Sequence, residues 1–173
     1  MRNKDQVLKI NSFLSFRIKD ETYAINAGKI LHILEMVKIT KIPKAPEYMK
    51  GVINLRGTVL PIIDMRTKLE LDTENLSLNA CILVLELRVK NKKLQLGAII
   101  DEVKEVLELQ EENIKPSPSI GSKYSADFIE GVAIVNEDFV MILDIEKILS
   151  SKEFDSLKKI STTQVGKNLE SVK

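Results

Sequence analysis

Only one histidine and one cysteine are available for chemistry in this chain of 173 residues. His32 lies in "ILHILEM", between aliphatic neighbours, where a partly buried structural histidine is expected. A Ser/His/Asp triad would have to use His32, but no G-x-S-x-G turn is present to expose a serine. A zinc site needs several His or Cys ligands, and neither a G-x-G-x-x-G motif nor a phosphate-binding loop occurs. The sequence therefore predicts no catalysis, no metal and no cofactor.

Acid/base catalysis by carboxylates is the remaining enzymatic alternative, with Asp64, Asp144 and Glu108 as the candidate groups. Acidic residues number 25, so the presence of three candidates carries little weight. Asp64 and Asp144 also occupy equivalent places in an internal repeat. This equivalence favours a structural role, in which each aspartate caps a similar turn.

The internal repeat pairs "YMKGVINLRGTVLPIIDMRTKL", from Tyr48, with "FIEGVAIVNEDFVMILDIEKIL", from Phe128, at an offset of 80 residues and without a gap. Gly51 and Gly131 stand at the same place in both copies, which predicts a backbone requirement such as close packing or a bulge. Upstream the match continues at an offset of 73 residues, where Ile30, Ile33, Leu34, Glu35 and Pro43 meet Val103, Val106, Leu107, Glu108 and Pro116. We therefore expect two copies of one small unit, at about residues 23–69 and 96–149, within a domain of about 10–150.

Short runs of Ile, Val and Leu that alternate or are continuously apolar predict strands. The runs are "FLSFRI", "YAINA", "GVINL", "TVLPIID", "ACILVLELRV", "LQLGAII", "GVAIV" and "FVMILD". Many short strands with frequent turns indicate small barrels or a sandwich, so the fold class is mainly all-β. Helical spacing predicts one helix from Asp144 to Ile160, and "DMRTKLEL" one short turn. The polar tail, Ser161 to Lys173, is expected to be disordered.

Composition limits the class of protein and its partners. Hydrophobic residues make up 44% and charged residues 29%, which is typical of a soluble globular protein. The net charge of +1 does not favour nucleic acid as a partner. The chain has neither a membrane-spanning apolar run nor a signal peptide, and the single Cys81 suits a reducing cytoplasm.

The order of these segments resembles the CheW family of bacterial chemotaxis adaptors. "YAINAGKILHILEM", "YMKGVINLRGTVLPIIDMRTKL", "LGAIIDEVKEVLEL" and "FIEGV" carry the resemblance, which covers about Ser12 to Leu149. It implies two intertwined five-stranded SH3-like barrels with a groove between them, followed here by the C-terminal helix. It also implies a non-catalytic cytoplasmic scaffold that is a monomer in isolation. Such a scaffold ties the histidine kinase CheA, through its SH3-like regulatory domain, to the tips of methyl-accepting chemoreceptors in arrays at the inner membrane.

Arg56 stands among apolar residues in "GVINLRGTVLPIID", where its charge needs a partner if it is buried. Asn136 occupies its place in the second copy, so Arg56 is a better candidate for function than Asp64. Glu35 and Asp64 are the two plausible partners, and the resemblance points to an ion pair of Arg56 with Glu35 beside the receptor-binding surface. A solvent-facing hairpin arginine is the alternative.

The remaining candidates are surface segments. We expect the receptor face to hold Ile30, Ile33, Leu34, Glu35, Asn54, Leu55, Arg56, Gly57, Val103 and Val106, although core packing is the alternative for the apolar ones. An edge formed by Ile39, Lys41, Pro43 and Glu47 is the candidate kinase surface. The basic hairpin tip, Lys90 to Lys93, is expected to be a solvated turn. A module that binds the kinase but no receptor remains open as a third hypothesis.

Overall fold

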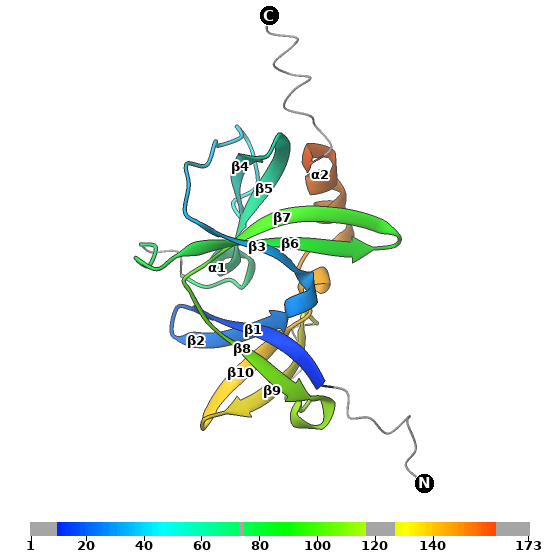
Figure 1. Ribbon diagram of the computed structural model, residues 1–173. Helices are drawn as coiled ribbons and strands as arrows, with labels where there is room; N and C mark the ends of the chain where they lie inside the picture. Colours follow the sequence, from blue (N-terminus) through cyan, green and yellow to red (C-terminus); the bar gives the residue numbers. More distant parts are fainter. Residues whose placement is uncertain (1–9, 73–74, 117–126, 162–173) are drawn as a thin grey trace, which may run out of the picture.

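The computed structural model describes residues 10–72, 75–116 and 127–161 of the chain. Two five-stranded sheets, each curled into a small barrel, stand one above the other, as expected for a mainly β protein (Figure 1). The tail expected to be disordered lies outside the described residues, apart from Ser161. Among the described helices, none combines the length and the apolar character that crossing a bilayer would require.

Barrel A, the lower one in Figure 1, takes its strands from both ends of the described chain. In spatial order the strands are β8 (Glu102–Gln110), β1 (Ile10–Ile18), β2 (Glu21–Asn26), β10 (Asp138–Leu143) and β9 (Ile129–Val135). Neighbouring strands are antiparallel, except that β2 and β10 are parallel.

Barrel B is built in the same order from the middle of the chain. Its strands are β3 (Ile30–Glu35), β6 (Cys81–Val89), β7 (Lys92–Ile100), β5 (Thr58–Asp64) and β4 (Met49–Leu55). The parallel pair is here β5 with β7. The register confirms the sequence repeat: Ile33 pairs with Leu83 as Val106 pairs with Leu14, and Leu34 pairs with Ile82 as Leu107 pairs with Phe13.

The two barrels exchange their hairpins. The β1–β2 hairpin belongs to the first unit but completes the barrel of β8, β9 and β10 from the second unit. The β6–β7 hairpin belongs to the second unit and completes the barrel of β3, β4 and β5. Each unit therefore spans five strands, and the expected intertwining of the barrels is confirmed.

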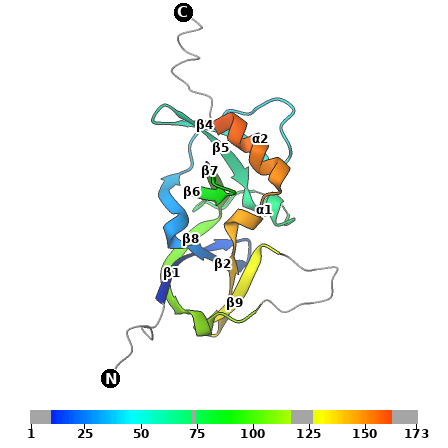
Figure 2. The same cartoon turned by 90° about the vertical axis from the view of Figure 1, so that its right-hand side faces the viewer.

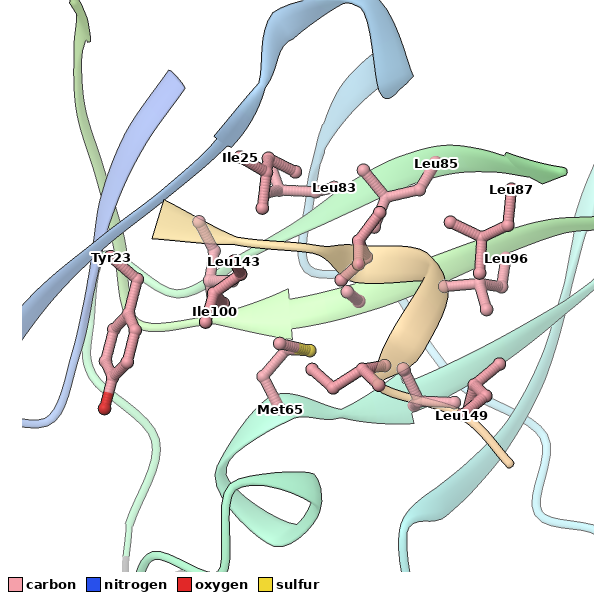
Figure 3. Packing of buried hydrophobic residues seen from close by; sticks show 14 of the residues in the cluster. Tyr23, Ile25, Met65, Leu83, Leu85, Leu87, Leu96, Ile100, Leu143 and Leu149 are labelled. Carbon is pink, nitrogen blue, oxygen red and sulfur yellow. The ribbon is translucent and has the colours of Figure 1, made fainter. Parts of the chain in front are cut away.

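The largest cluster of buried hydrophobic residues lies between the barrels, and each barrel has a smaller cluster in its interior. The sequence of β6 is almost continuously apolar because both faces of the strand are buried. Leu83, Leu85 and Leu87 face the central cluster, while Ile82 and Val84 face the interior of barrel B. Figure 3 shows Ile25 of β2 beside Leu83 of β6 in the central cluster.

Gly51 and Gly131 meet the predicted backbone requirement. A Cβ atom on Gly51, whose φ is +143°, would lie 2.1 Å from the Thr40 carbonyl oxygen. On Gly131 it would lie 2.7 Å from the carbonyl oxygen of Lys115. The close approach is a bridge in each unit, Thr40 with Val52 and Lys115 with Val132. Thr40 and Lys115 correspond in these bridges at an offset of 75 residues, so the sequence match of Pro43 with Pro116, at an offset of 73, is two residues out of step.

Short helices connect and cover the barrels. A 3-10 turn, η2 (Ala27–Lys29), leads from β2 into β3, and η3 (Glu111–Asn113) follows β8. The expected turn after β5 is α1 (Met65–Lys68). The helix predicted from Asp144 to Ile160 is instead divided into η5 (Ile145–Lys147) and α2 (Ser151–Ser161). Figures 1 and 2 show α2 against barrel B, where it contacts β5 and β7.

Candidate protein-interaction site

Strand β3 is an edge strand of barrel B, because it pairs only with β6. One side of its backbone has no partner strand, and none of its six residues is fully buried. Ile33 is 50% exposed and Leu31 40%, while Ile30 and Leu34 are half-buried and pack against the central and the barrel B clusters. Two of the three named apolar residues, Ile30 and Leu34, therefore pack on the core, as the core-packing alternative expected, and Ile33 is left exposed. His32, which was expected to be partly buried, is exposed.

Strand β8 is the matching edge of barrel A. Val106, the repeat counterpart of Ile33, is 61% exposed, and Val103 is half-buried against the central cluster. Figures 1 and 2 both place β3 and β8 on the same side of the molecule, one above the other. Two equivalent edge strands therefore present an exposed apolar side chain each on this side.

Arg56 lies at the tip of the β4–β5 hairpin. Arg56 and Gly57 have φ values of 53° and 85°, the left-handed pair that a two-residue hairpin turn of type I′ requires. The Asn54 side-chain oxygen accepts a hydrogen bond of 2.8 Å from the Gly57 N–H. The matching turn of β9–β10 uses Asn136, at φ 51°. Asparagine tolerates this conformation and arginine does so at a cost of about 1 kcal/mol, so the turn alone does not explain Arg56.

Arg56 and Glu35 are both exposed and form no ion pair with each other in the described structure, so the expected pairing is wrong for this conformation. Glu35 ends β3 and Arg56 follows β4, and these two strands do not pair with each other in the sheet of barrel B. An exposed pair would gain only about 0–1 kcal/mol and would have to order two long side chains. The alternative of a solvent-facing arginine describes this state.

The candidate kinase edge lies in the segment between β3 and β4. Ile39 is half-buried and packs on the barrel B interior, whereas Lys41, Pro43 and Glu47 are exposed. A hollow of about 300 Å³ opens beside this segment. Its lining residues are Met36, Ile39, Lys41, Lys50, Asp64, Arg66, Asn75, Leu76 and Ile99. The hollow combines an apolar wall with several cations, which suits contact with a protein rather than a reaction.

The comparisons with known proteins agree with this geometry. The family model of the CheW-like domain matches residues 12–153. The chain belongs to the CheW family. It is 33% identical over 141 residues to the chemotaxis protein CheW of Klebsiella aerogenes, with 82% of each chain covered. It is 34% identical over 146 residues to the chemotaxis protein CheW of Helicobacter pylori, with 84% of this chain and 85% of the relative covered.

A solved CheW structure has the same fold. The scaffolding protein TtCheW from Thermoanaerobacter tengcongensis superposes with a TM-score of 0.74 at 27% sequence identity, covering 84% of this chain and 97% of that one. The chain is therefore a chemotaxis scaffold of the CheW family and not an enzyme.

The candidate catalytic groups have structural roles that suit a CheW scaffold. Asp64 accepts a hydrogen bond from the Arg66 N–H at 2.9 Å and Asp144 one from the Glu146 N–H at 3.2 Å, so each aspartate caps the turn that follows its strand. Burial raises the pKa of the Cys81 thiol, which keeps it protonated and unreactive. Among the residues that the structure describes, no group of three or more His, Cys, Asp or Glu side chains could hold a metal.

Sequence reasoning missed a buried ion pair of this CheW fold. The Arg66 guanidinium donates to the Asp101 carboxylate at 2.8 Å (Nη2–Oδ2), and both side chains are at least 92% buried. Asp101 also accepts from the Lys19 N–H at 2.5 Å. Arg66 belongs to barrel B, Lys19 to barrel A, and Asp101 to the crossing between β7 and β8. In the sequence, Arg66 is visible only as part of "DMR" in the stretch "YMKGVINLRGTVLPIIDMRTKL", which does not indicate its partner.

Proposed function

We propose that this protein couples the histidine kinase CheA to the cytoplasmic tips of chemoreceptors, as a bridge without catalysis in the bacterial cytoplasm. Membership of the CheW family supports the chemotaxis role. The observation that carries the bridging role is the presence of two separate candidate surfaces, the side with the β3 and β8 edges and the segment between β3 and β4.

The receptor surface in this proposal consists of the two edge strands and the β4–β5 hairpin. Exposed Ile33 and Val106 offer apolar contacts to an amphipathic helix, whose apolar face needs such a surface to become buried. Ile30, Leu34 and Val103 support these contacts from half-buried positions. Arg56 would contribute a planar, permanently charged group that donates to carboxylates or carbonyls of the helix.

The kinase surface is the segment that holds Ile39, Lys41, Pro43 and Glu47. A bridge between Thr40 and Val52 fastens the segment to β4, through two backbone hydrogen bonds of 2.9 Å. Gly51 makes this approach possible. The segment therefore offers a positioned edge that suits the SH3-like regulatory domain of the kinase.

The proposal is tested by sedimenting receptor fragments with the kinase and this protein, using the wild type and Arg56→Asn. Asparagine is the residue of the matching turn, so the variant should unfold at the same temperature or a slightly higher one. We expect its affinity for the receptor to fall about tenfold, as for a lost central arginine contact, with kinase binding unchanged.

Lys90→Asn is the matched control, because Lys90 is also exposed, also left-handed at φ 49°, and lies at a hairpin tip outside both surfaces. It should leave receptor binding unchanged. Binding of kinase and receptor only in mutual exclusion would contradict the bridge. Kinase binding with no receptor binding by the wild type would favour a kinase-only module.

A further inference from the structure

The β6–β7 hairpin is longer than its repeat counterpart. Ala24 in β2 and Gly97 in β7 are equivalent, because they pair with Ile142 and Ile62 in the two parallel ladders. From Ala24 to the turn, the β1–β2 ladder has three further residue pairs, and from Gly97 the β6–β7 ladder has five. The hairpin thus carries an extension of two additional pairs, Arg88 with Lys93 and Val89 with Lys92, beyond its counterpart.

Four of the six residues of the extension are cationic. Arg88, Lys90, Lys92 and Lys93 are all exposed. Arg88 and Lys92 form only long, exposed ion pairs, at 3.9 Å to Glu86 and 3.7 Å to Asp155, and Lys90 and Lys93 form none with described residues. Lys90 occupies a left-handed position that asparagine or glycine would fill at lower cost. Turn formation therefore does not account for the charge of the extension.

Helix α2 supports the extension. Phe154 and Leu157 are buried in the central cluster together with Leu87 and Leu94 at the base of the hairpin. The Lys158 ammonium donates a hydrogen bond to the Lys93 carbonyl oxygen, which adds another cation beside the extension. The cations consequently stand on a braced element rather than on a loop, so less conformational entropy is lost when a partner binds.

A hollow of about 460 Å³ lies beside this charged extension. Val89 of the extension, Leu149 and the buried Phe154 provide its apolar part. Lys147 lies at its border, together with the carboxylates of Asp127 and Glu146. The Glu146 carboxylate is already engaged, because it pairs with Lys29 and accepts the Arg88 N–H at 3.0 Å. The hollow can accept an apolar side chain, and Val89 in its lining joins it to the cationic extension.

Charge is also divided between the two halves of the molecule. Residues 10–26, 102–116 and 127–144, which form barrel A, contain twelve acidic and four basic residues, a net charge of −8. Residues 27–72, 75–101 and 145–161, barrel B with α2, contain ten acidic and sixteen basic residues, a net charge of +6. The net charge of the whole chain is near zero, but barrel B with α2 is basic. The cations of the hairpin extension add to the positive electrostatic potential of this half, which attracts acidic groups.

We propose that the hairpin extension and α2 form a third docking surface, which binds an acidic protein segment with one apolar anchor in the adjacent hollow. The extension, "RVKNKK", has no aromatic side chain on which nucleic acid bases could stack. Its one apolar residue, Val89, is half-buried, so no apolar group is offered to a membrane. The surface lies outside the two surfaces of the proposed adaptor function and goes beyond it.

The test uses a fluorescein-labelled peptide in which one phenylalanine is flanked by runs of glutamate, titrated with the full chain at low ionic strength. Fluorescence anisotropy should show binding that salt weakens. The double variant Lys90→Glu with Lys93→Glu should bind about tenfold more weakly, since two rim charges are reversed. A peptide with serine in place of phenylalanine should bind several-fold more weakly than the original, in keeping with the hollow.

The matched control is Lys38→Glu with Lys44→Glu, two exposed lysines of the segment between β3 and β4 that change the net charge equally. It should alter the affinity less than twofold. Equal losses in the two double variants, with unchanged melting temperatures, would overturn the proposal, because net charge alone would then explain binding. Tighter binding of a single-stranded oligonucleotide or of anionic vesicles than of the peptide would overturn it as well.

Discussion

At the scale of single residues, the two crossings between the barrels are held by ion pairs of opposite polarity. Arg66 and Glu146 are repeat counterparts, each in the first turn after the last strand of its unit. Arg66 binds an acid, Asp101, in the crossing from β7 to β8. Glu146 binds a base, Lys29, in the crossing from β2 to β3. In both cases the carboxylate also accepts a backbone N–H from the exchanged hairpin.

Burial should decide how much each pair contributes. Asp101→Asn leaves the Arg66 charge buried without its partner and should lower the free energy of unfolding by about 3–5 kcal/mol. Glu146→Gln removes a charge from a pair whose side chains are 35% and 21% exposed, so about 0–1 kcal/mol is expected. Urea unfolding with an unchanged m value measures both.

The control for the buried pair is the double variant Arg66→Leu with Asp101→Leu. It should be less destabilised than Asp101→Asn, because no unpaired charge remains inside. Similar costs for Asp101→Asn and Glu146→Gln would show that burial does not separate the two crossings.

At the scale of elements, Glu153 is one of the residues that fasten α2 to barrel B. Glu153 accepts hydrogen bonds from the Ser150 N–H and from the Lys68 ammonium, both at 2.9 Å. Burial alone would raise the pKa of Glu153. The hydrogen bonds and the Lys68 charge outweigh burial, so the pKa of Glu153 is lowered. The same lysine lies over the ring of Tyr48, 4.7 Å from its centroid.

A glutamate whose pKa is lower in the folded chain stabilises the fold above its unfolded pKa of about 4.3, and this contribution is lost as pH falls through the folded pKa. Glu153→Gln should therefore lower the free energy of unfolding by about 1 kcal/mol at neutral pH, with the difference vanishing in acid. Urea unfolding of the wild type and the variant, at neutral pH and in acid, measures this difference in the free energy of unfolding. The control is Glu108→Gln, because Glu108 is exposed on β8 and forms no ion pair with the described residues. This variant should change the free energy of unfolding little at either pH. A loss of stability in Glu153→Gln that does not depend on pH would contradict the lowered pKa of Glu153.

At the scale of the whole molecule, hairpin exchange makes each barrel depend on both units. Barrel A lacks β1 and β2 without the first unit, and barrel B lacks β6 and β7 without the second. A sheet missing two strands exposes edges and half of its core. The adaptor surfaces share this dependence, because β3 pairs with β6 and β8 with β1.

Fragments 1–76 and 77–173 test this dependence. Each alone should show no cooperative thermal unfolding by circular dichroism, and a mixture should form a one-to-one complex with the spectrum of the intact chain. Cutting the folded chain at an inserted protease site in the same loop is the control, and should leave the fold intact. Cooperative unfolding of either fragment alone would contradict the interdependence of the units.

The sequence by itself determined the repeat, the family, most strands and several structural residues. These features depend on neighbours along the chain: alternation predicts a strand, and an aspartate after a strand predicts a cap. Gly51 and Gly131 were also recognisable, because only a backbone requirement explains a glycine at the same place in two otherwise diverged copies. The candidate receptor and kinase surfaces followed from the family resemblance and remain proposals.

Only the tertiary structure decided which segments meet. Strands β3 and β8 are not among the strands that the sequence predicts, because their exposed apolar residues break the alternation that identifies a half-buried strand. Hairpin exchange, the Arg66–Asp101 pair and the separation of Arg56 from Glu35 depend on contacts between residues distant in sequence. Local patterns do not specify such contacts, since the packing of the central core between the barrels selects the pairing and with it the side chains that are left exposed.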